Sequence, residues 1–272
     1  MPPTAEAGTT GAWTLRAGQA SVAVDLADGG RLTSLVVGEL ELLGGVGTTA
    51  IEHGSFVMAP WAGRIRRGRL VWGELDFALP IDRVPPHAGH GLVVDSQWQA
   101  LRVGSQRVRL QCVLDARWPA AGFVVQDIAL AEHHLVQQVE VHASHEAFPA
   151  TVGWHPWFRR DLGLGQPAQL QFQAAGMLRR NDEGIPDGSV VEVPPGPWDD
   201  CFVGVHWPVV ITWPGALRLS IEADTDMAVV YDQRSAAFCV EPQSGPPDGP
   251  NTAPRVVSPD DPLVVRTMWR WS

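Results

Sequence analysis

The chain is built from short segments in which apolar and polar residues alternate, separated by turns rich in glycine and proline. Residues 20–26 and 32–37 form the first clear pair, with Asp28-Gly29-Gly30 between them. Alternation with a period of two indicates a strand with one buried face, and a glycine turn between two such segments favours a hairpin. The pattern therefore predicts an antiparallel hairpin near the N-terminus.

The same alternation recurs along most of the chain. Further strands are predicted at residues 98–114 (two strands around Gly104-Ser105), 123–130, 135–141, 170–172, 209–212, 217–221, 227–231, 238–243 and 263–269. No amphipathic segment is longer than two helical turns, and no repeat or linker divides the chain. So many strands predict an all-β fold, a large antiparallel two-sheet β-sandwich, as one domain at residues 13–272 after a disordered tail at residues 1–12.

Composition narrows the functional classes. The net charge of −10 argues against a nucleic-acid or anionic-membrane partner, because both require clustered positive charge. All 20 basic residues are arginine, so the chain lacks a Schiff-base lysine and the lysine of a phosphate-binding loop. Cys112, Cys201 and Cys239 are far apart and predict neither a disulfide framework nor a zinc knuckle. With no secretory signal or membrane-length apolar segment, the expected location is cytoplasmic.

Two segments place a titratable group among apolar residues. The segment Gly153-Trp-His-Pro-Trp-Phe158 surrounds His155 with aromatic side chains, which suit the apolar faces of a sugar ring. Glu241 sits at the end of an apolar strand and precedes a proline, and burial there would raise its pKa. A half-buried structural histidine is the competing interpretation of His155.

Three further polar residues stand in glycine- or proline-rich surroundings. Arg64 follows an apolar segment, His90 lies between two glycines, and Asp199 follows a proline-rich loop. The neighbouring Arg66, Arg67 and Arg69 favour an exposed edge strand protected by charge. The histidine pair at positions 87 and 90 and the histidines at positions 133, 134, 142 and 145 lack the flanking ligands of a metal site, so no metal is predicted.

The set lacks a serine nucleophile elbow, a flanked catalytic cysteine and a glycine-rich phosphate loop. A histidine and a carboxylate remain, which can serve as a general acid and a general base.

Five short segments, in order, resemble the aldose 1-epimerase (mutarotase) family of the galactose mutarotase-like superfamily. They are Pro60-Trp-Ala-Gly-Arg-Ile65, His90-Gly91, Gly153-Trp-His-Pro-Trp-Phe158, Trp198-Asp-Asp-Cys-Phe202 and Val240-Glu-Pro-Gln243. The resemblance implies a twisted β-sandwich, the galactose mutarotase-like supersandwich, with a small-molecule sugar bound in a cleft on a sheet and no metal or organic cofactor.

The resemblance also implies residue roles in the interconversion of the α and β anomers of a free hexose. His155 would protonate the ring oxygen, and Glu241 would take the proton of the anomeric hydroxyl. His90 would assist at the ring oxygen, Arg64 and Asp199 would hold hydroxyls, and Trp157 would shape the sugar pocket.

Two positions depart from the family pattern. Gly63 stands where the family usually has asparagine, and Trp157 stands where tyrosine is commoner. Both departures bear on sugar preference, which the sequence leaves open together with the oligomeric state.

Three alternatives remain. A hexose-6-phosphate 1-epimerase would turn Arg66, Arg67 or Arg69 towards a phosphate. A non-catalytic sugar-binding protein would bind without chemistry. A glycosidase would use Asp199 and Glu241 as its carboxylate pair.

Overall fold

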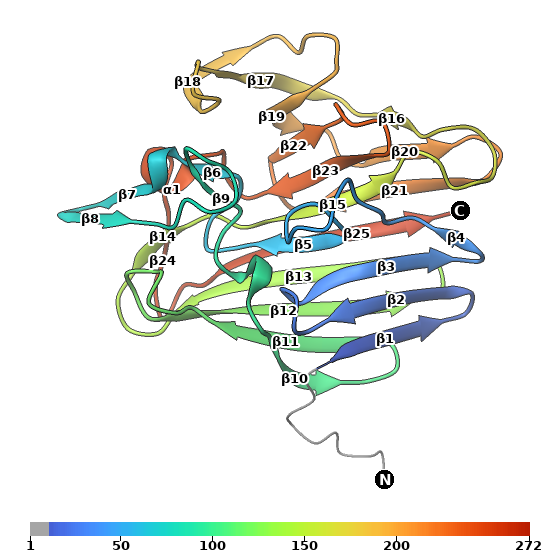
Figure 1. Cartoon of the computed structure of the whole chain (residues 1–272), viewed down its shortest axis with the longest axis horizontal. Coiled ribbons are helices and arrows are strands. Elements are labelled where there is room, and N and C mark those ends of the chain that lie inside the picture. Colours follow the sequence, from blue (N-terminus) through green and yellow to red (C-terminus); the bar gives the residue numbers. More distant parts are fainter. Residues whose placement is uncertain (1–10) are drawn as a thin grey trace.

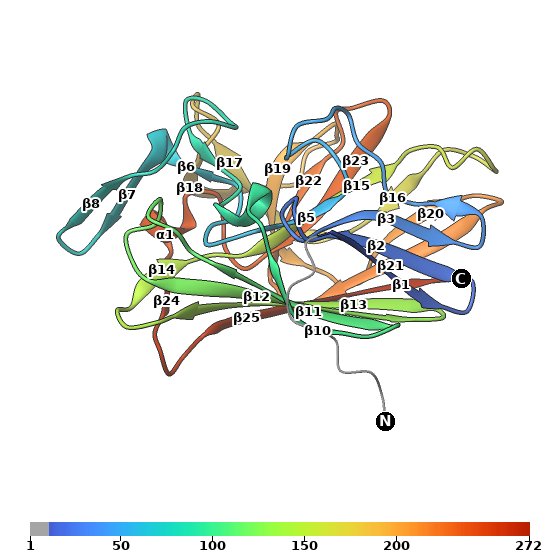
Figure 2. The ribbon, with the colours of Figure 1, turned by 60° about the horizontal axis from the view of Figure 1, so that its bottom comes forward.

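The structure, a computed structural model, describes residues 11–272 as two large sheets packed face to face (Figures 1 and 2). All strand pairs within them are antiparallel, and the helical part is limited to the one-turn α1 (Gly249–Thr252) and two 3-10 turns. The predicted all-β sandwich is thus confirmed. Most of the predicted tail, residues 1–12, lies outside the described residues, and the first strand already begins at Ala12.

The larger sheet carries eleven strands. Their order is β1 (Ala12–Ala17), β2 (Ala20–Asp25), β3 (Arg31–Val37), β5 (Ser55–Met58), β15 (Gly153–Arg159), β23 (Ala237–Gln243), β22 (Met227–Tyr231), β19 (Asp199–Val205), β17 (Ala174–Arg180) and β18 (Pro186–Val191), with β4 (Leu40–Glu41) beside β3. The predicted N-terminal hairpin is β2–β3. Strands far apart in sequence, such as β5, β15 and β23, are neighbours at the centre of this sheet.

The smaller sheet has eight strands. Their order is β10 (Gln99–Val103), β11 (Arg107–Val113), β12 (Gly122–Ala131), β13 (His134–Ala143), β25 (Leu263–Trp271), β21 (Leu217–Ala223), β20 (Val209–Trp213) and β16 (Gln169–Gln171). Three two-stranded ribbons complete the fold: β14 (Phe148–Ala150) with β24 (Arg255–Val257), β6 (Arg64–Ile65) with β9 (Ala88–Gly89), and β7 (Arg69–Trp72) with β8 (Leu75–Ala78).

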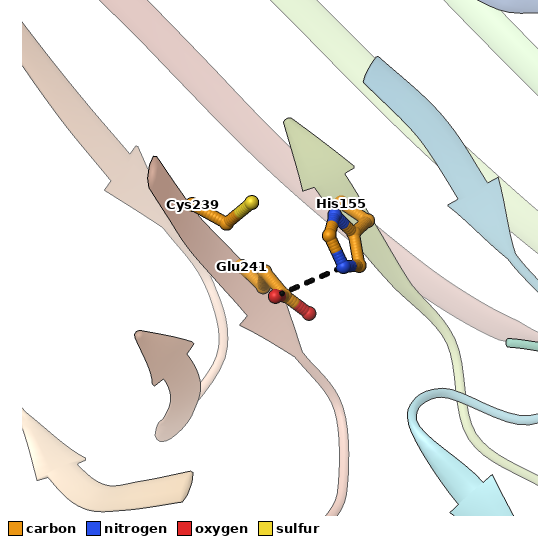
Figure 3. Close-up of side chains that lie close together, drawn as sticks. All are labelled: His155, Cys239 and Glu241. Atoms are coloured by element: carbon orange, nitrogen blue, oxygen red, sulfur yellow. Dashed lines mark ion pairs between the residues drawn. The ribbon is translucent and has the colours of Figure 1, made fainter. Parts of the chain in front are cut away.

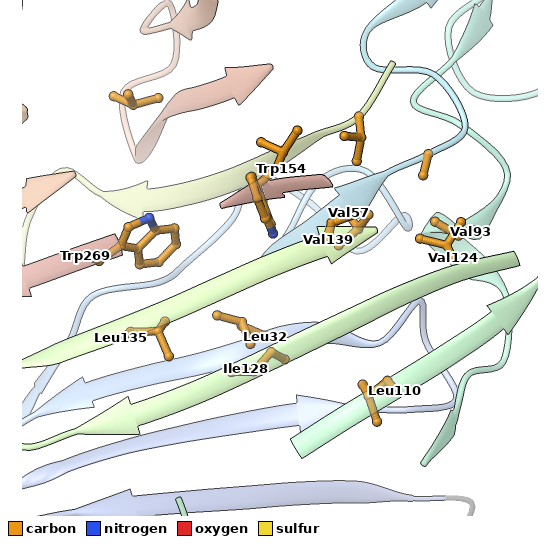
Figure 4. Packing of buried hydrophobic residues seen from close by; sticks show 14 of the residues in the cluster. Leu32, Val57, Val93, Leu110, Val124, Ile128, Leu135, Val139, Trp154 and Trp269 are labelled. Carbon is orange, nitrogen blue, oxygen red and sulfur yellow. The ribbon is translucent and has the colours of Figure 1, made fainter. Parts of the chain in front are cut away.

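The hydrophobic core lies between the two sheets. On β25, buried positions alternate with more exposed ones, as a strand covered on one face requires. Trp154 and Val57 of the larger sheet face Val139 and Trp269 of the smaller one (Figure 4). Each large apolar side chain buried in this way contributes roughly 1.5–3 kcal/mol to folding.

The central strands β15 and β23 are buried on both faces. Trp154 and Phe158 point into the core, so His155 and Trp157, which alternate with them, lie on the outer face of the sheet. Loops and the ribbons β6–β9 and β7–β8 lie on this side of the larger sheet (Figure 2). The fold therefore covers the outer face locally and leaves room for a cavity there.

Two sequence interpretations were wrong. The proline-rich segment before Asp199, interpreted as a loop, contains the strand β18, and Arg64–Arg69 is not one edge strand. It is β6, a 3-10 turn at Arg66–Gly68 and the start of β7, because Gly63, Arg67 and Gly68 take positive φ angles that interrupt an extended chain.

One glycine next to the candidate site has no room for a side chain. Gly91 has φ +77°, and a Cβ there would lie 2.2 Å from the carbonyl oxygen of Ala59. Gly73, in the β7–β8 turn, has φ +57° but no atom within 4 Å of its Cβ position. Both replacements by alanine carry the left-handed backbone penalty of about 1–2 kcal/mol, and only Gly91→Ala adds a backbone clash.

We therefore expect Gly91→Ala to lower the free energy of unfolding clearly more than Gly73→Ala, as measured by urea denaturation. Equal losses in the two variants would contradict the close approach of Gly91 to Ala59.

Candidate active site

Strand register places His155 and Glu241 side by side. Gly153 pairs with Gln243 and Trp157 with Cys239, so His155 on β15 lies opposite Glu241 on β23. The row continues in both directions across the sheet, through Phe56 on β5 and Val229 on β22. Residues directly opposite each other share a face, so this row belongs to the outer face.

The hydrogen-bond ladder between β15 and β23 is interrupted at this row. No pairing is formed between the Gly153–Gln243 and Trp157–Cys239 positions. Pro156 and Pro242 lie within the gap, and proline has no N–H to donate to a ladder. Glu241 therefore lies inside a strand, two residues before its end, and not at the strand end that the sequence suggested.

His155 and Glu241 form a buried pair. The imidazole Nε2 lies 3.3 Å from Oε1 of the carboxyl group (Figure 3), and both residues are at most 5% exposed. The Gln243 side-chain amide donates a hydrogen bond of 3.1 Å to the other oxygen, Oε2. The imidazole stacks on Phe56 with ring centroids 4.7 Å apart. Contacts from three strands thus fix the orientation of the pair.

Burial shifts the pKa of each of the two groups in the direction that favours its neutral form. The pKa of Glu241 is raised well above its usual value, chiefly by desolvation and then by the negative charge of Asp199. The pKa of His155 is lowered, chiefly by desolvation and then by His90. Since a charged pair and a neutral pair hold the same single proton, the shifts favour placing that proton on the carboxyl group.

His90 is held beside the pair by the β6–β9 ribbon. Its backbone N–H donates to the carbonyl of Gly63 at 2.7 Å, and its ring meets that of His155 edge-on at 5.1 Å. Its Nδ1 lies 3.1 Å from the sulfur of Met58. Burial, followed by the charges of Arg64 and Arg83, lowers the pKa of His90 to about 3. His90 is therefore neutral near pH 7 and can form hydrogen bonds without adding a positive charge.

Arg64 and Asp199 line the same cavity, together with an arginine that the sequence did not single out, Arg180. A carboxyl oxygen of Asp199 lies 3.3 Å from Arg64 and 3.1 Å from Arg180. Arg180 also pairs with Asp200 at 2.8 Å. Each of these acids has a cationic partner, so their charges largely cancel.

Trp157 closes one side of the site. Its indole N–H donates to the carbonyl of Ile51 at 2.9 Å, and its ring packs edge-on against Tyr231 at 5.6 Å. The polar group of the indole is therefore directed to a covering loop. The ring presents apolar surface near His155, with centroids 5.2 Å apart.

All six predicted site residues line one cavity of about 280 Å³. They are Arg64, His90, His155, Trp157, Asp199 and Glu241. The lining also includes Arg83, Arg180, Tyr231, Arg234 and Gln243. Convergence of an acid–base pair, aromatic surface and paired charges in one cavity is typical of a small polar ligand site.

The sequence profile of the aldose 1-epimerase family matches residues 11–251. The chain belongs to the aldose 1-epimerase family. A search of curated proteins finds no match. In the part of the chain that the structure describes, no helix has the length and apolar character to cross a membrane.

Several solved structures share the fold of this chain. A candidate aldose 1-epimerase of Escherichia coli K12 superimposes with a TM-score of 0.83 at 20% identity, covering 96% of this chain and 98% of its own. A galactose mutarotase-like protein of Clostridium acetobutylicum gives 0.82 at 15% identity, with coverage of 95% and 94%. A galactose 1-epimerase of Lactobacillus acidophilus gives 0.77 at 17% identity, with coverage of 95% and 93%. The galactose mutarotase-like sandwich is thus confirmed.

The structure explains the Gly63 departure. Gly63 has φ +64°, a conformation in which glycine is favoured and asparagine is the best-tolerated side chain. The backbone conformation at position 63 therefore accepts either glycine or asparagine. Relative to the family pattern, glycine removes only a side-chain amide next to Arg64.

Several residues of the site escaped the sequence analysis. Phe56, which stacks on His155, and Arg180, which lines the cavity, carry no local signal, since their positions depend on the pairing of β5 with β15 and of β17 with β19. Gln243 could have been found, because a residue two positions after Glu241 in a strand shares its face. His87 proves to be structural: its ring accepts the N–H of Arg67 at 3.0 Å and bonds the carbonyl of Glu183 at 2.8 Å.

The raised pKa of Glu241 gives stability a defined dependence on pH. A carboxyl group whose folded pKa exceeds its unfolded value, about 4.3, stabilises the protein fully below that pH, and this contribution is lost as the pH rises through the folded pKa. We therefore expect Glu241→Gln to gain thermal stability relative to the wild type as the pH rises from about 5 to about 8.

Glu52, also on the cavity lining, is the matched control. Hydrogen bonds from Thr49 lower the pKa of its carboxyl group, so Glu52→Gln should show no such gain. Melting curves at several pH values measure both. A gain that is independent of pH, or one equal in the two variants, would mean that Glu241 titrates normally.

Proposed function

We propose that this chain is an aldose 1-epimerase that interconverts the α and β anomers of a free hexose, with His155 and Glu241 as the proton-transfer pair. The observation that carries this proposal is the contact of 3.3 Å between the imidazole and the carboxyl group on the lining of one cavity. Ring opening removes a proton from the anomeric hydroxyl and delivers one to the ring oxygen. Both oxygens are bonded to the same carbon, so the acid and the base must lie close together.

In the proposed reaction, Glu241 accepts the proton of the anomeric hydroxyl while His155 donates one to the ring oxygen. The bond from C1 to the ring oxygen breaks, and an aldehyde and a hydroxyl group form. Rotation about the C1–C2 bond presents the other face of the aldehyde. The reverse transfers then close the ring as the other anomer, and the pair regains its starting protonation.

The electrostatics of the pair suit a reversible reaction. The proposed ring opening starts from the charged form of the pair, a protonated imidazole and a carboxylate, which their mutual attraction and the Gln243 hydrogen bond to the carboxylate stabilise. It ends with the neutral form, which desolvation favours. The two effects oppose each other, as a proton transfer that runs in both directions requires.

The remaining residues fit binding roles. Arg64 and Asp199 offer a donor and an acceptor whose charges are mutually neutralised, as suits hydroxyl groups on an uncharged sugar. His90, neutral near pH 7, can hydrogen-bond a sugar oxygen but adds no positive charge. The Trp157 ring supplies an apolar surface for the sugar face. We place the protein in the cytoplasm, in keeping with its three free cysteines.

The pair is tested by substitution. We expect His155→Asn and Glu241→Gln each to slow mutarotation by about 10²–10⁴-fold, because each removes one positioned proton-transfer group. Polarimetry of freshly dissolved α-D-glucose, with a small panel of other hexoses, measures the rate. His142→Asn is the control, since His142 pairs with Glu140 on the other sheet. Wild-type rates in Glu241→Gln would remove the proposed base, and tight sugar binding without any rate would favour a binding protein.

A phosphorylated hexose is the second candidate substrate. One observation supports it, but with a different arginine from those considered from the sequence. Arg66, Arg67 and Arg69 do not line the cavity and pair with Glu183 or Asp76. Arg234 lines the cavity, is exposed, and forms no ion pair with any described residue. A phosphate would therefore be held by Arg234 rather than by the three arginines considered from the sequence.

Comparison of glucose with glucose 6-phosphate separates the two substrates. For a free hexose, we expect Arg234→Ala to change kcat/KM less than about twofold, because an exposed group at the rim contributes little to an uncharged ligand. Preference for glucose 6-phosphate in the wild type, lost in Arg234→Ala, would overturn the free-hexose proposal. Arg69→Ala, distant from the cavity and paired with Asp76, is the matched control.

A further inference from the structure

A buried thiol adjoins the proposed acid–base pair and has no part in the proposed reaction. Cys239 is fully buried on β23, two residues before Glu241, so both side chains lie on the outer face of the sheet. The candidate ligand atoms of His155, Cys239 and Glu241 all lie within 4.8 Å of one another (Figure 3). Within residues 11–272 this is the one group of three or more histidine, cysteine or acidic side chains so arranged.

We propose that His155, Cys239 and Glu241 form a binding site for a thiophilic divalent cation, Zn²⁺ or Cd²⁺, and that this cation switches the site off. The binding claim is independent of the enzymatic reaction. The inhibition claim rests on the proposed function.

The geometry of the pair already matches a tetrahedral metal. Two ligand atoms that are each about 2.0 Å from a tetrahedral Zn²⁺ lie about 3.3 Å apart, and Nε2 of His155 and Oε1 of Glu241 are separated by 3.3 Å. A thiolate about 2.3 Å from the same ion would lie about 3.5 Å from each of them. The cysteine sulfur therefore has to approach by little more than about 1 Å, which a side-chain rotation supplies.

The ligand set selects the class of cation. An imidazole and a thiolate favour Zn²⁺ and Cd²⁺, whereas Mg²⁺ and Ca²⁺ prefer oxygen ligands only. Two more buried polar atoms at the site, Nδ1 of His155 and Oε1 of Gln243, have no hydrogen-bond partner among the described residues. The protein therefore leaves polar capacity unused around this group, as expected of a site that accommodates a polar guest.

Binding would block the proposed chemistry directly. On coordination, the thiol proton and the single proton shared by His155 and Glu241 pass to solvent, and the metal takes up the lone pairs of Nε2 and Oε1. Neither atom can then accept or deliver a proton, and the cation occupies the space of the anomeric carbon's oxygens. Inhibition should therefore be competitive with the sugar and reversed by a chelator.

Cd²⁺ is the sharpest probe, because a cadmium–thiolate bond produces a charge-transfer absorption in the ultraviolet that oxygen and nitrogen ligands do not. Cys201 provides the matched control: it is a buried thiol on the cavity lining, and it is outside the three-residue group. We expect one equivalent of Cd²⁺ to produce the band in the wild type and in Cys201→Ser, and no band in Cys239→Ser. A band retained in Cys239→Ser, lost in Cys201→Ser, or absent from the wild type overturns the proposal.

Calorimetry with Zn²⁺ tests the other two ligands without any assay of activity. Loss of an outer-shell partner alone typically weakens metal binding 10–100-fold, so Cys239→Ser and Glu241→Gln should each raise the Kd of Zn²⁺ at least about tenfold, with Cys201→Ser unchanged and Mg²⁺ not bound. If Cys239→Ser does not fold, as judged by circular dichroism, Glu241→Gln decides. Equal affinity in the wild type and Glu241→Gln overturns the site.

Inhibition is measured last, by polarimetry. Cys239→Ser should retain the basal rate and need at least about tenfold more Zn²⁺ for half-inhibition. A wild type that binds Zn²⁺ but has no mutarotase activity would refute the proposed function and leave the metal site standing. An active wild type whose rate is unaffected by bound Zn²⁺ would refute the inhibition.

Discussion

The candidate site depends on His155 and Glu241, whose imidazole and carboxyl group are buried together in the middle of the larger sheet. Burying either alone in charged form would be expensive, but the two share one proton and can exist as a charged or a neutral pair without gaining or losing protons. Their partners, Phe56 beneath the imidazole and Gln243 on the carboxyl group, come from the same sheet. The arrangement is therefore as rigid as the sandwich core behind it.

The strands β15 and β23 carry core residues on one face and residues of the candidate site on the other. The core-facing residues Trp154 and Phe158 alternate with His155 and Trp157. One seven-residue strand therefore provides both core side chains and side chains of the candidate site. Pro156 and Pro242 stand where the ladder between β15 and β23 is open. Proline at such central positions weakens a sheet, and the dense packing on the core side offsets this loss.

The sequence was sufficient for the fold class and for the two residues at the centre of the site, for different physical reasons. Alternation is a local property, so hairpins such as β2–β3 and β12–β13 could be predicted from neighbouring residues. His155 and Glu241 could be found because each sits in a short, recognisable segment. Their mutual position could not be predicted, since it depends on the pairing of β15 with β23, which are far apart in sequence, and the same holds for the position of Cys239 beside His155. Arg66, Arg67 and Arg69 were interpreted as charges that protect an exposed edge strand. Their partners could not be predicted, because Glu183 is remote in sequence and Asp76 lies on the next strand.

The charges around the cavity argue for a neutral polyol as the natural guest. Arg64 and Arg180 are committed to Asp199 and Asp200, and Arg83 to Asp95 at 2.5 Å. Paired charges of this kind offer directed donors and acceptors with little net field, which suits hydroxyl groups and gives an anionic ligand little advantage. Apart from the exposed Arg234, the proton-sharing pair is then left to respond to the guest. In the proposed reaction, the two oxygens on the anomeric carbon would replace the direct contact between the imidazole and the carboxyl group. They would restore the hydrogen bonds that the pair loses on separation, so that binding and proton transfer would use the same contacts.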